Sequence, residues 1–276
     1  MRLQPNTPEA IFYLYKDEHE AYEGISEGGA GSYIAMFDDD DNFSRVFAVT
    51  NTHLIAQGYS TLRFNKAEGG IAVAPTDPND WVMHPNGDDI SILQIFSSDT
   101  FRTNEPDFTM HPAIKKYKNI LTLEDVDKYN IGIGDEVNMI SRHLEIEGVE
   151  YNLPIVRFGQ ISRMATRDGI LNPHTGLHQC TIICEMRSTS GHSGSPVNVL
   201  IDRSLWRWKV LPEGEDKGVM QFLLGIDWGH ITNTNNVKNR QDSALDTGLE
   251  VQTSSNLACV IPAWKIKEVI DSISET

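Results

Sequence analysis

The chain has 276 residues, of which 39% are hydrophobic and 22% are charged. This composition supplies a sizeable core and excludes an intrinsically disordered chain, and the length fits two packed domains. With 39 acidic and 23 basic residues, the formal net charge is −16. Because so acidic a surface repels phosphate groups and anionic lipid, we expect neither nucleic acid nor a membrane as a partner.

The sequence gives no sign of export or of a membrane span. The apolar run at residues 10–15 is shorter than a signal-peptide core, and nowhere do 18 apolar residues run together. Cys180, Cys184 and Cys259 are a sparse, odd-numbered set. On one strand the first two would lie too far apart to bridge easily. We therefore expect reduced thiols in the core of a cytoplasmic protein.

Short apolar runs separated by Gly, Asn and Asp predict many short β-strands, which indicates a sandwich or barrel. In chain order these runs are residues 10–15, 32–37, 46–50, 90–96, 136–140, 153–158, 180–186, 197–201, 222–226 and 257–261. The second and third runs flank four aspartates at 38–41 and predict a hairpin. Its acidic turn lacks the ligand alternation of a calcium loop, so we interpret it as a solvated turn.

Two segments have helical periodicity. Residues 121–129 place apolar side chains three and four apart in the middle of the chain, where a connector between two barrels would lie. Residues 262–273 begin with proline and form one apolar stripe. The stripe consists of Trp264, Ile266, Val269, Ile270 and Ile273. Between predicted strands, residues 202–218 with Trp206 and Trp208 indicate a long surface loop.

Three polar segments point to nucleophilic catalysis. Residues 50–53 end an apolar run with His53, an Asp88–Asp89 pair precedes the next such run, and two glycines bracket Ser193. A serine hydroxyl becomes a good nucleophile when an imidazole takes its proton, and a carboxylate orients that imidazole. Adjacent glycines let backbone N–H groups approach a developing oxyanion. We favour Asp89 over Asp88 for the carboxylate because it directly precedes the strand.

In their order and context these segments resemble the trypsin-like (chymotrypsin-fold) serine peptidases. Residues 191–196 match Gly-x-Ser-Gly-x-Pro, residues 89–93 match Asp-Ile-x-x-Leu, and residues 225–229 resemble a substrate-binding strand that ends in Trp-Gly. The Gly-x-Ser-Gly-Ser-Pro form and the terminal helix are closer to bacterial intracellular and glutamyl-endopeptidase-like members than to digestive ones.

The resemblance implies an all-β fold of two packed six-stranded antiparallel β-barrels followed by a C-terminal α-helix. The first barrel would comprise residues 1–118 and carry His53 and Asp89. Residues 119–132 would be the connector, residues 133–262 the second barrel with Ser193, and residues 263–276 the helix. The cleft between the barrels would then hold the site.

The resemblance also implies the function: a serine endopeptidase that hydrolyses polypeptides through an acyl-enzyme. His53 would be the general base, Asp89 its orienting carboxylate and Ser193 the nucleophile. The N–H groups of Gly191 and Ser193 would form the oxyanion hole. No cofactor or metal is expected, because the histidines and cysteines show no metal-ligand spacing. The alternative is a catalytically weak or partner-activated protein of the same fold that binds peptides or a regulatory protein.

For substrate binding, the resemblance assigns Trp228 and Gly229 to pairing with an extended substrate, and Ser188 and His230 could also reach the specificity pocket. Arg187 falls at the family's pocket-floor position and would favour an acidic side chain. Asp227 would favour a basic one, or could pair with Arg187 and leave the pocket neutral.

The residue before the nucleophile departs from the family pattern. Secreted members carry an aspartate there, which pairs with a freshly cleaved N-terminus, whereas this chain has His192. We therefore expect no activation by N-terminal cleavage.

Overall fold

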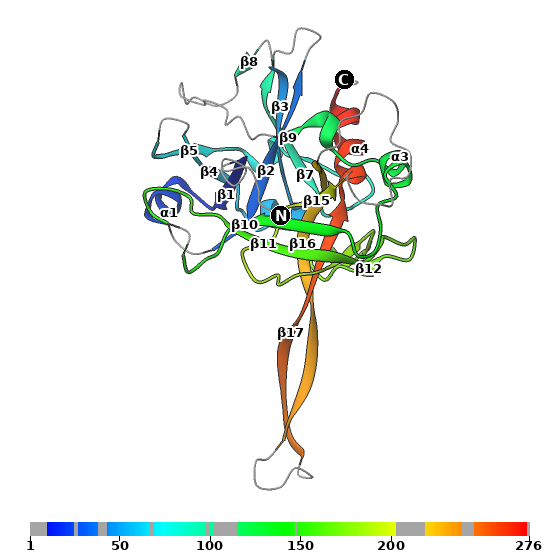
Figure 1. The fold of residues 1–276 in the computed structure, drawn as a ribbon. Coiled ribbons are helices and arrows are strands. Elements are labelled where there is room, and N and C mark those ends of the chain that lie inside the picture. The colour runs from blue at the N-terminus through cyan, green and yellow to red at the C-terminus, as the bar shows by residue number, and fades with distance from the viewer. Residues whose placement is uncertain are drawn as a thin grey trace.

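The computed structural model describes residues 10–24, 27–37, 43–66, 69–97, 100–101, 115–146, 148–202, 219–238 and 246–274 (Figure 1). The predicted acidic turn at 38–41 and the predicted loop with Trp206 and Trp208 lie outside these residues. The elements of the N-terminal half are β1 (Ile11–Tyr15), α1 (Glu18–Glu23), β2 (Ala30–Phe37), β3 (Phe43–Thr50), α2 (Thr52–Ala56), β4 (Thr61–Asn65), β5 (Ile71–Pro75), the 3₁₀ helix η2 (Pro78–Asp80), β6 (Val82–Met83), β7 (Ser91–Ser97), β8 (Thr100–Phe101) and β9 (Lys115–Lys116).

The remaining elements are the 3₁₀ helix η3 (Tyr117–Asn119), α3 (Leu123–Lys128), β10 (Glu136–Ser141), β11 (Ile155–Arg163), β12 (Ile170–Leu171), β13 (His178–Gln179), β14 (Ile182–Glu185), β15 (Pro196–Asp202), β16 (Val219–Lys238), β17 (Asp246–Pro262) and α4 (Ala263–Ser274). Each apolar run predicted as a strand overlaps one of these strands, and both predicted helices are present as α3 and α4. The mostly-β prediction is therefore confirmed.

The C-terminal half forms the closed barrel that the sequence predicts. Its strands follow one another in the order β10-β11-β14-β17-β16-β15, and β15 returns to β10 through antiparallel pairs such as Asn138 with Asn198. The inward-facing side chains of these strands, including Val137, Val197 and Leu224, are fully buried. The interior is thus a packed core.

Within the residues that the structure describes, the N-terminal half forms an open sheet and not the predicted closed six-stranded barrel. Its strands make an open nine-stranded sheet with the main order β5-β4-β1-β2-β3-β7-β6, to which β8 and β9 are attached. Closure would require the two ends of this path to pair. In the described residues β5 pairs with β4 and β6 pairs with β7, and β6 contributes only Val82 and Met83. An exposed strand of two residues is too short to close the sheet.

β16 and β17 are much longer than the predicted strands 222–226 and 257–261. Beyond the barrel they continue as a two-stranded ribbon that projects from the body of the protein (Figure 1). Side chains 232–237 in this ribbon are exposed and include two threonines and three asparagines. This polar sequence lacks the apolar alternation by which a half-buried strand is recognised, which explains why the sequence analysis missed the extension.

The two halves are joined through the predicted connector and helix. The N–H of Leu121, just before α3, donates to the carbonyl of Leu223 on β16 at 3.1 Å. The apolar stripe of α4 is buried as predicted, with Ile266, Val269 and Ile270 inside the core and Trp264 at its edge. No described helix is long and apolar enough to cross a membrane.

Candidate active site

The pairing of β3 with β7 brings His53 and Asp89 together. His53 follows the end of β3, Asp89 precedes the start of β7, and the antiparallel register places Thr50 opposite Ser91. The expected turn after β3 is the first turn of the short helix α2, so His53 lies on a helix rather than at a strand end. The side chain of Asn51 donates to the Asp89 carbonyl at 2.9 Å and ties the two segments.

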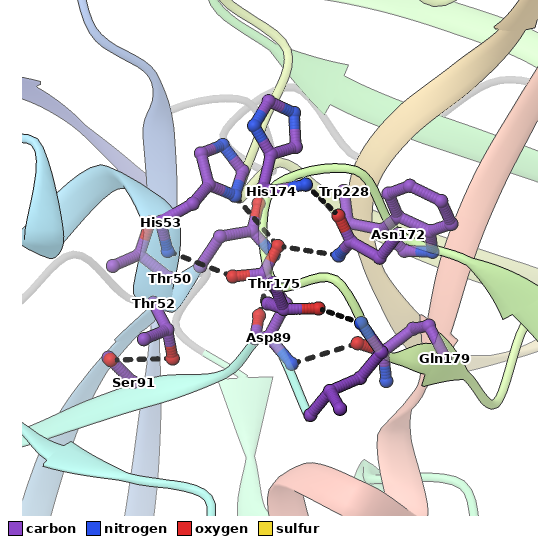
Figure 2. Close-up of polar contacts among 12 residues, drawn as sticks. Thr50, Thr52, His53, Asp89, Ser91, Asn172, His174, Thr175, Gln179 and Trp228 are labelled. Atoms are coloured by element: carbon purple, nitrogen blue, oxygen red, sulfur yellow. Dashed lines mark hydrogen bonds and ion pairs between the residues drawn. The ribbon is translucent and has the colours of Figure 1, made fainter. Parts of the chain in front are cut away.

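His53 and Asp89 form a buried pair with two contacts (Figure 2). The Nδ1 atom of His53 lies 2.7 Å from Oδ2 of Asp89, and the backbone N–H of His53 donates to Oδ1 at 2.9 Å. Burial would raise the pKa of Asp89, but the hydrogen bonds and charge of His53, with a further hydrogen bond from Asn172, lower it overall. Asp89 is therefore a carboxylate that accepts a hydrogen bond from the Nδ1–H of His53, which leaves Nε2 free to act as a base.

The β12–β13 hairpin holds Asp89 from the other half of the chain. Asn172 donates from Nδ2 to Oδ2 of Asp89 at 3.1 Å, and the backbone N–H of Asp89 donates to Oε1 of Gln179 at 2.9 Å (Figure 2). The amide of Gln179 also donates to Asp88. Both aspartates are thus hydrogen-bonded to Gln179, and of the two it is Asp89 whose carboxylate contacts His53. No motif in the sequence pointed to Asn172 or Gln179.

His174, in the same hairpin, stacks on the candidate base. Its ring lies 4.1 Å from the ring of His53 with an interplanar angle of 13°. The pKa of His174 is lowered by partial burial and by the charge of His53, an effect that Asp89 partly offsets. A neutral His174 covers one face of His53 without adding a second positive charge when His53 takes up a proton.

Removal of the Asn172 amide is expected to lower kcat at least about tenfold in Asn172→Ala, because a hydrogen bond to a charged group is worth about 1.5–3 kcal/mol. Loss of this donor also removes one of the hydrogen bonds that lower the pKa of Asp89. Protonated Asp89 no longer orients His53, so the acid limb of the kcat/KM profile that Asp89 sets moves to higher pH. Steady-state kinetics extended to pH values below the ordinary pKa of an aspartate measure both effects.

Thr175→Ala is the matched control, since its hydroxyl accepts the Leu177 N–H at 3.3 Å in the same loop. A tenfold loss in both variants, with no shift of the acid limb, would assign the effect to the loop and not to Asp89.

Ser193 lies in a tight loop between β14 and β15. Two glycines in the left-handed region, Gly191 with φ of 88° and Gly194 with φ of 80°, make the turn possible. The Ser195 N–H donates to the His192 carbonyl at 2.9 Å, and the Ser193 carbonyl accepts the N–H of Ala30 at 2.8 Å. The second contact fixes the serine loop against β2, beside the His53–Asp89 pair.

One cavity of about 700 Å³ joins most of the predicted site residues. His53, Ser193 and Gly191 line it together with Ser188, Asp227, Trp228, Gly229 and His230. Asp89 lies behind His53 and is fully buried. No hydrogen bond joins Ser193 Oγ to His53 in the described chain, although both residues face this cavity.

Arg187 is the predicted site residue that the cavity does not include. Its side chain is exposed, and within the described residues it makes no ion pair with Asp227. Asp227 is fully buried and accepts a hydrogen bond from Ser188 Oγ at 2.8 Å. The family pattern places the pocket floor six residues before Ser193, but the conformation of the loop Ser188–Ser193 leaves Arg187 outside the cavity.

His192, which was expected only to prevent N-terminal activation, is a structural part of the serine loop. It is fully buried, and its Nδ1 accepts the Thr189 N–H at 3.1 Å. Burial and, secondarily, the charge of Arg157 lower its pKa to about 3. His192 is therefore neutral at physiological pH, and the hydrogen bond that it accepts from Thr189 stabilises the turn of the serine loop.

The buried neutral His192 makes stability depend on pH. Its pKa is lowered on folding, so between pH 6.5 and about 3 the unfolded chain binds the extra proton. The contribution of neutral His192 to the free energy of unfolding is fully present above pH 6.5. It is lost as the pH falls, by at most about 1.4 kcal/mol per pH unit. In His192→Asn the amide oxygen can accept the Thr189 N–H but does not titrate.

We expect His192→Asn to lose less stability than the wild type between pH 7.5 and 5. Urea unfolding at both pH values measures this difference. The exposed His19→Asn serves as the control and should keep the wild-type slope; an equal slope in all three proteins would contradict the assignment to His192.

The three cysteines are free, as expected, and are not candidate nucleophiles. Burial, with the nearby Asp227 carboxyl second, raises the pKa of Cys259 to about 12, and burial raises the pKa of Cys184 further still. Both thiols are therefore protonated. Among the described residues, no group of three or more His, Cys, Asp or Glu side chains is placed to hold a metal ion.

Comparisons with known proteins leave the family open. No protein-family model matches the chain, and no curated protein matches it. Two solved structures of Rv3671c from M. tuberculosis H37Rv align with it at 12% identity and a TM-score of 0.46. One is the inactive form of the protease, covering 97% of this chain and 90% of that one; the other is a mutant in the inactive form, covering 98% and 89%. A likeness this distant does not establish a family, so the functional conclusion depends on the geometry of the site.

Proposed function

We propose that the protein is a serine endopeptidase in which Ser193 attacks the peptide carbonyl, His53 takes the serine proton, and Asp89 orients His53. The observation that carries this proposal is the buried His53–Asp89 pair, joined at Nδ1 to Oδ2 and at N to Oδ1, beside a cavity that Ser193 also lines. A histidine fixed at Nδ1 by a carboxylate presents Nε2 to its surroundings as a base.

The serine loop also supplies candidate oxyanion donors. Within the described part of the chain, the N–H groups of Gly191 and Ser193 have no protein acceptor, while neighbouring N–H groups of the loop do. Donors left unpaired beside a nucleophile can stabilise the negative charge of a tetrahedral intermediate. We therefore assign these two N–H groups to the oxyanion hole, and the edge of β16 at Trp228 and Gly229 to pairing with the substrate backbone.

Reaction with a fluorophosphonate probe tests the proposal. We expect the wild type to be labelled on Ser193 and Ser193→Ala to be unlabelled. Ser162→Ala, which removes a half-buried serine of β11 outside the cavity, should be labelled like the wild type. Labelling of Ser193→Ala, or failure of the wild type to label, would contradict an acyl-enzyme mechanism.

One observation favours the alternative of a partner-activated or catalytically weak protein that binds peptides. Ser193 and His53 are not hydrogen-bonded in the described chain, and His174 lies stacked on His53. Catalytic hydrogen bonds are often long before substrate binds. Under the alternative, labelling would be slow and would accelerate only when a peptide or protein partner is added, which a time course of labelling distinguishes.

A further inference from the structure

The backbone of Asp227 is fixed to the nucleophile loop. Its N–H donates to the Ser195 carbonyl at 2.9 Å, and its carbonyl accepts the Gly194 N–H at 2.8 Å. These two bonds hold the two residues that directly follow Ser193 and set the distance between β16 and the serine loop. The side chain of Asp227 is consequently held on the wall of the cavity that the nucleophile lines.

The carboxyl group of Asp227 is incompletely paired. Its Oδ2 accepts the hydroxyl of Ser188 at 2.8 Å, whereas its Oδ1 has no hydrogen-bond partner although the residue is fully buried. An unsatisfied buried acceptor of this kind costs free energy in the folded protein. Native structures usually pair such groups, so an unpaired one beside a binding cavity indicates a place for a ligand donor.

Among the described residues, Asp227 forms no ion pair with a lysine or arginine. No lysine or arginine lines the described cavity, and Asp227 is the only aspartate or glutamate among the lining residues. Arg187 is exposed, and in the part of the chain that the structure describes it makes no ion pair with Asp227. The adjacent thiols of Cys184 and Cys259 are protonated and bring no charge.

Burial raises the pKa of the Asp227 carboxyl well above its usual value, against a smaller lowering by the Ser188 hydrogen bond. Without a cation the group therefore keeps its proton. An entering ammonium or guanidinium group supplies the missing positive charge and a hydrogen-bond donor to Oδ1, and the carboxyl proton leaves to solvent.

We propose that Asp227 selects a substrate with a lysine or arginine side chain at the residue whose carbonyl Ser193 attacks. This inference rests on the proposed peptidase function, which it deepens by naming the substrate class. Ser188 holds one carboxylate oxygen and leaves the other for the substrate cation. A neutral side chain of the same shape leaves Oδ1 unpaired, and sites built around an unpaired polar group reject such analogues strongly.

Fluorogenic peptides that differ only at this residue test the selection. We expect kcat/KM for lysine to exceed that for the isosteric norleucine by on the order of 100-fold, and arginine to exceed citrulline similarly, as for truncation of a desolvated charge pair. Asp227→Asn should remove both ratios, whereas Arg187→Ala should keep them. Equal rates for charged and neutral peptides, or a preference for glutamate that Arg187→Ala abolishes, would overturn the assignment.

Binding to the inactive Ser193→Ala protein separates this inference from the proposed function. Benzamidine carries an amidinium cation, and benzamide is its neutral analogue. We expect calorimetry to show benzamidine binding at least tenfold tighter than benzamide, with the difference lost when Asp227→Asn is added. Equal binding of both compounds would refute the role of Asp227 even if the fluorophosphonate labels Ser193. Selective benzamidine binding without labelling of the wild type would instead support the cation site and refute the acyl-enzyme.

Discussion

Asp89→Asn is expected to lower kcat by about 10⁴-fold while leaving the fold intact, the loss typical of this change in a serine–histidine–aspartate triad. Both carboxylate oxygens of Asp89 accept hydrogen bonds. Oδ1 accepts the His53 backbone N–H, and Oδ2 receives the His53 ring and Asn172 Nδ2. An asparagine has one oxygen and one NH₂ group in place of the two carboxylate oxygens. At the position of either Oδ1 or Oδ2, its NH₂ group must therefore face another hydrogen-bond donor.

The preferred orientation of the asparagine decides the chemistry. With its oxygen toward the His53 backbone N–H, its NH₂ group faces the His53 ring, and Nδ1 must then act as the acceptor. The proton moves to Nε2, the atom that would have taken the proton from Ser193. The base is lost although every heavy atom stays in place, which a crystal structure of the variant can verify.

Asp88→Asn is the matched control. Asp88 is the neighbouring carboxylate, linked to Gln179 and close to Lys265 at 3.4 Å, and makes no contact with His53 in the described chain. We expect its kcat to stay within about tenfold of the wild type. Equal losses in the two variants would mean that the local turn, and not the carboxylate of Asp89, carries the effect.

The residues at strand ends could be predicted because a local pattern reports them. His53 and Asp89 follow or precede apolar runs whose alternation identifies β3 and β7, and antiparallel pairing of these strands is enough to bring the two side chains together. Ser193 is identified by its glycines, whose left-handed φ angles the loop requires. In each case the polar residue that suggests the chemistry lies within a few positions of the apolar run or glycine that indicates the local structure.

The contacts that Asn172 and Gln179 make with Asp89 could not be predicted, because they depend on the tertiary structure. Asn172 meets Asp89 across 83 positions in the sequence, from a hairpin whose paired segments have two residues each. So short a strand has no periodicity to detect. Arg187 is the opposite case: the family pattern assigns it to the pocket floor, but its side chain is exposed to solvent.

Closure of the N-terminal sheet could not be predicted from the sequence either. Whether a sheet closes depends on pairing between its first and last strands, which no alternation of side chains encodes. In the described residues the last strand of this sheet, β6, has two exposed residues, and the sheet is open.

Gly194→Ala is expected to destabilise the protein by about 3 kcal/mol or more, through backbone strain and overlap together. Gly194 has a φ of 80°, and a Cβ atom there would overlap the carbonyl oxygen of Ala30 and Oγ1 of Thr50. These atoms belong to β2 and β3 and are bonded to each other at 2.8 Å, so neither can move freely. For a protein of this size the melting temperature should fall by about 6–12 °C, measured by differential scanning calorimetry.

Gly58→Ala separates the two causes. Gly58 has a φ of 88°, nearly the same backbone strain, but no atom lies within 4 Å of its Cβ position. We expect it to lose about 1–2 kcal/mol, the cost of the left-handed conformation alone. Equal losses in the two variants would show that the serine loop does not pack on Ala30 as closely as the structure has it.

The overlap at Gly194 should also lower the reactivity of Ser193, because the serine loop contacts β2 at this point. Relief of the clash requires the loop to move away from β2, which breaks the 2.8 Å bond from Ala30 to the Ser193 carbonyl and separates Ser193 from His53. Fluorophosphonate labelling at 20 °C, where Gly194→Ala remains folded, should therefore be slower than in Gly58→Ala by about tenfold or more. A variant that is destabilised but labels at the wild-type rate would mean that the position of Ser193 is set by β16, through Asp227, and not by its contact with β2.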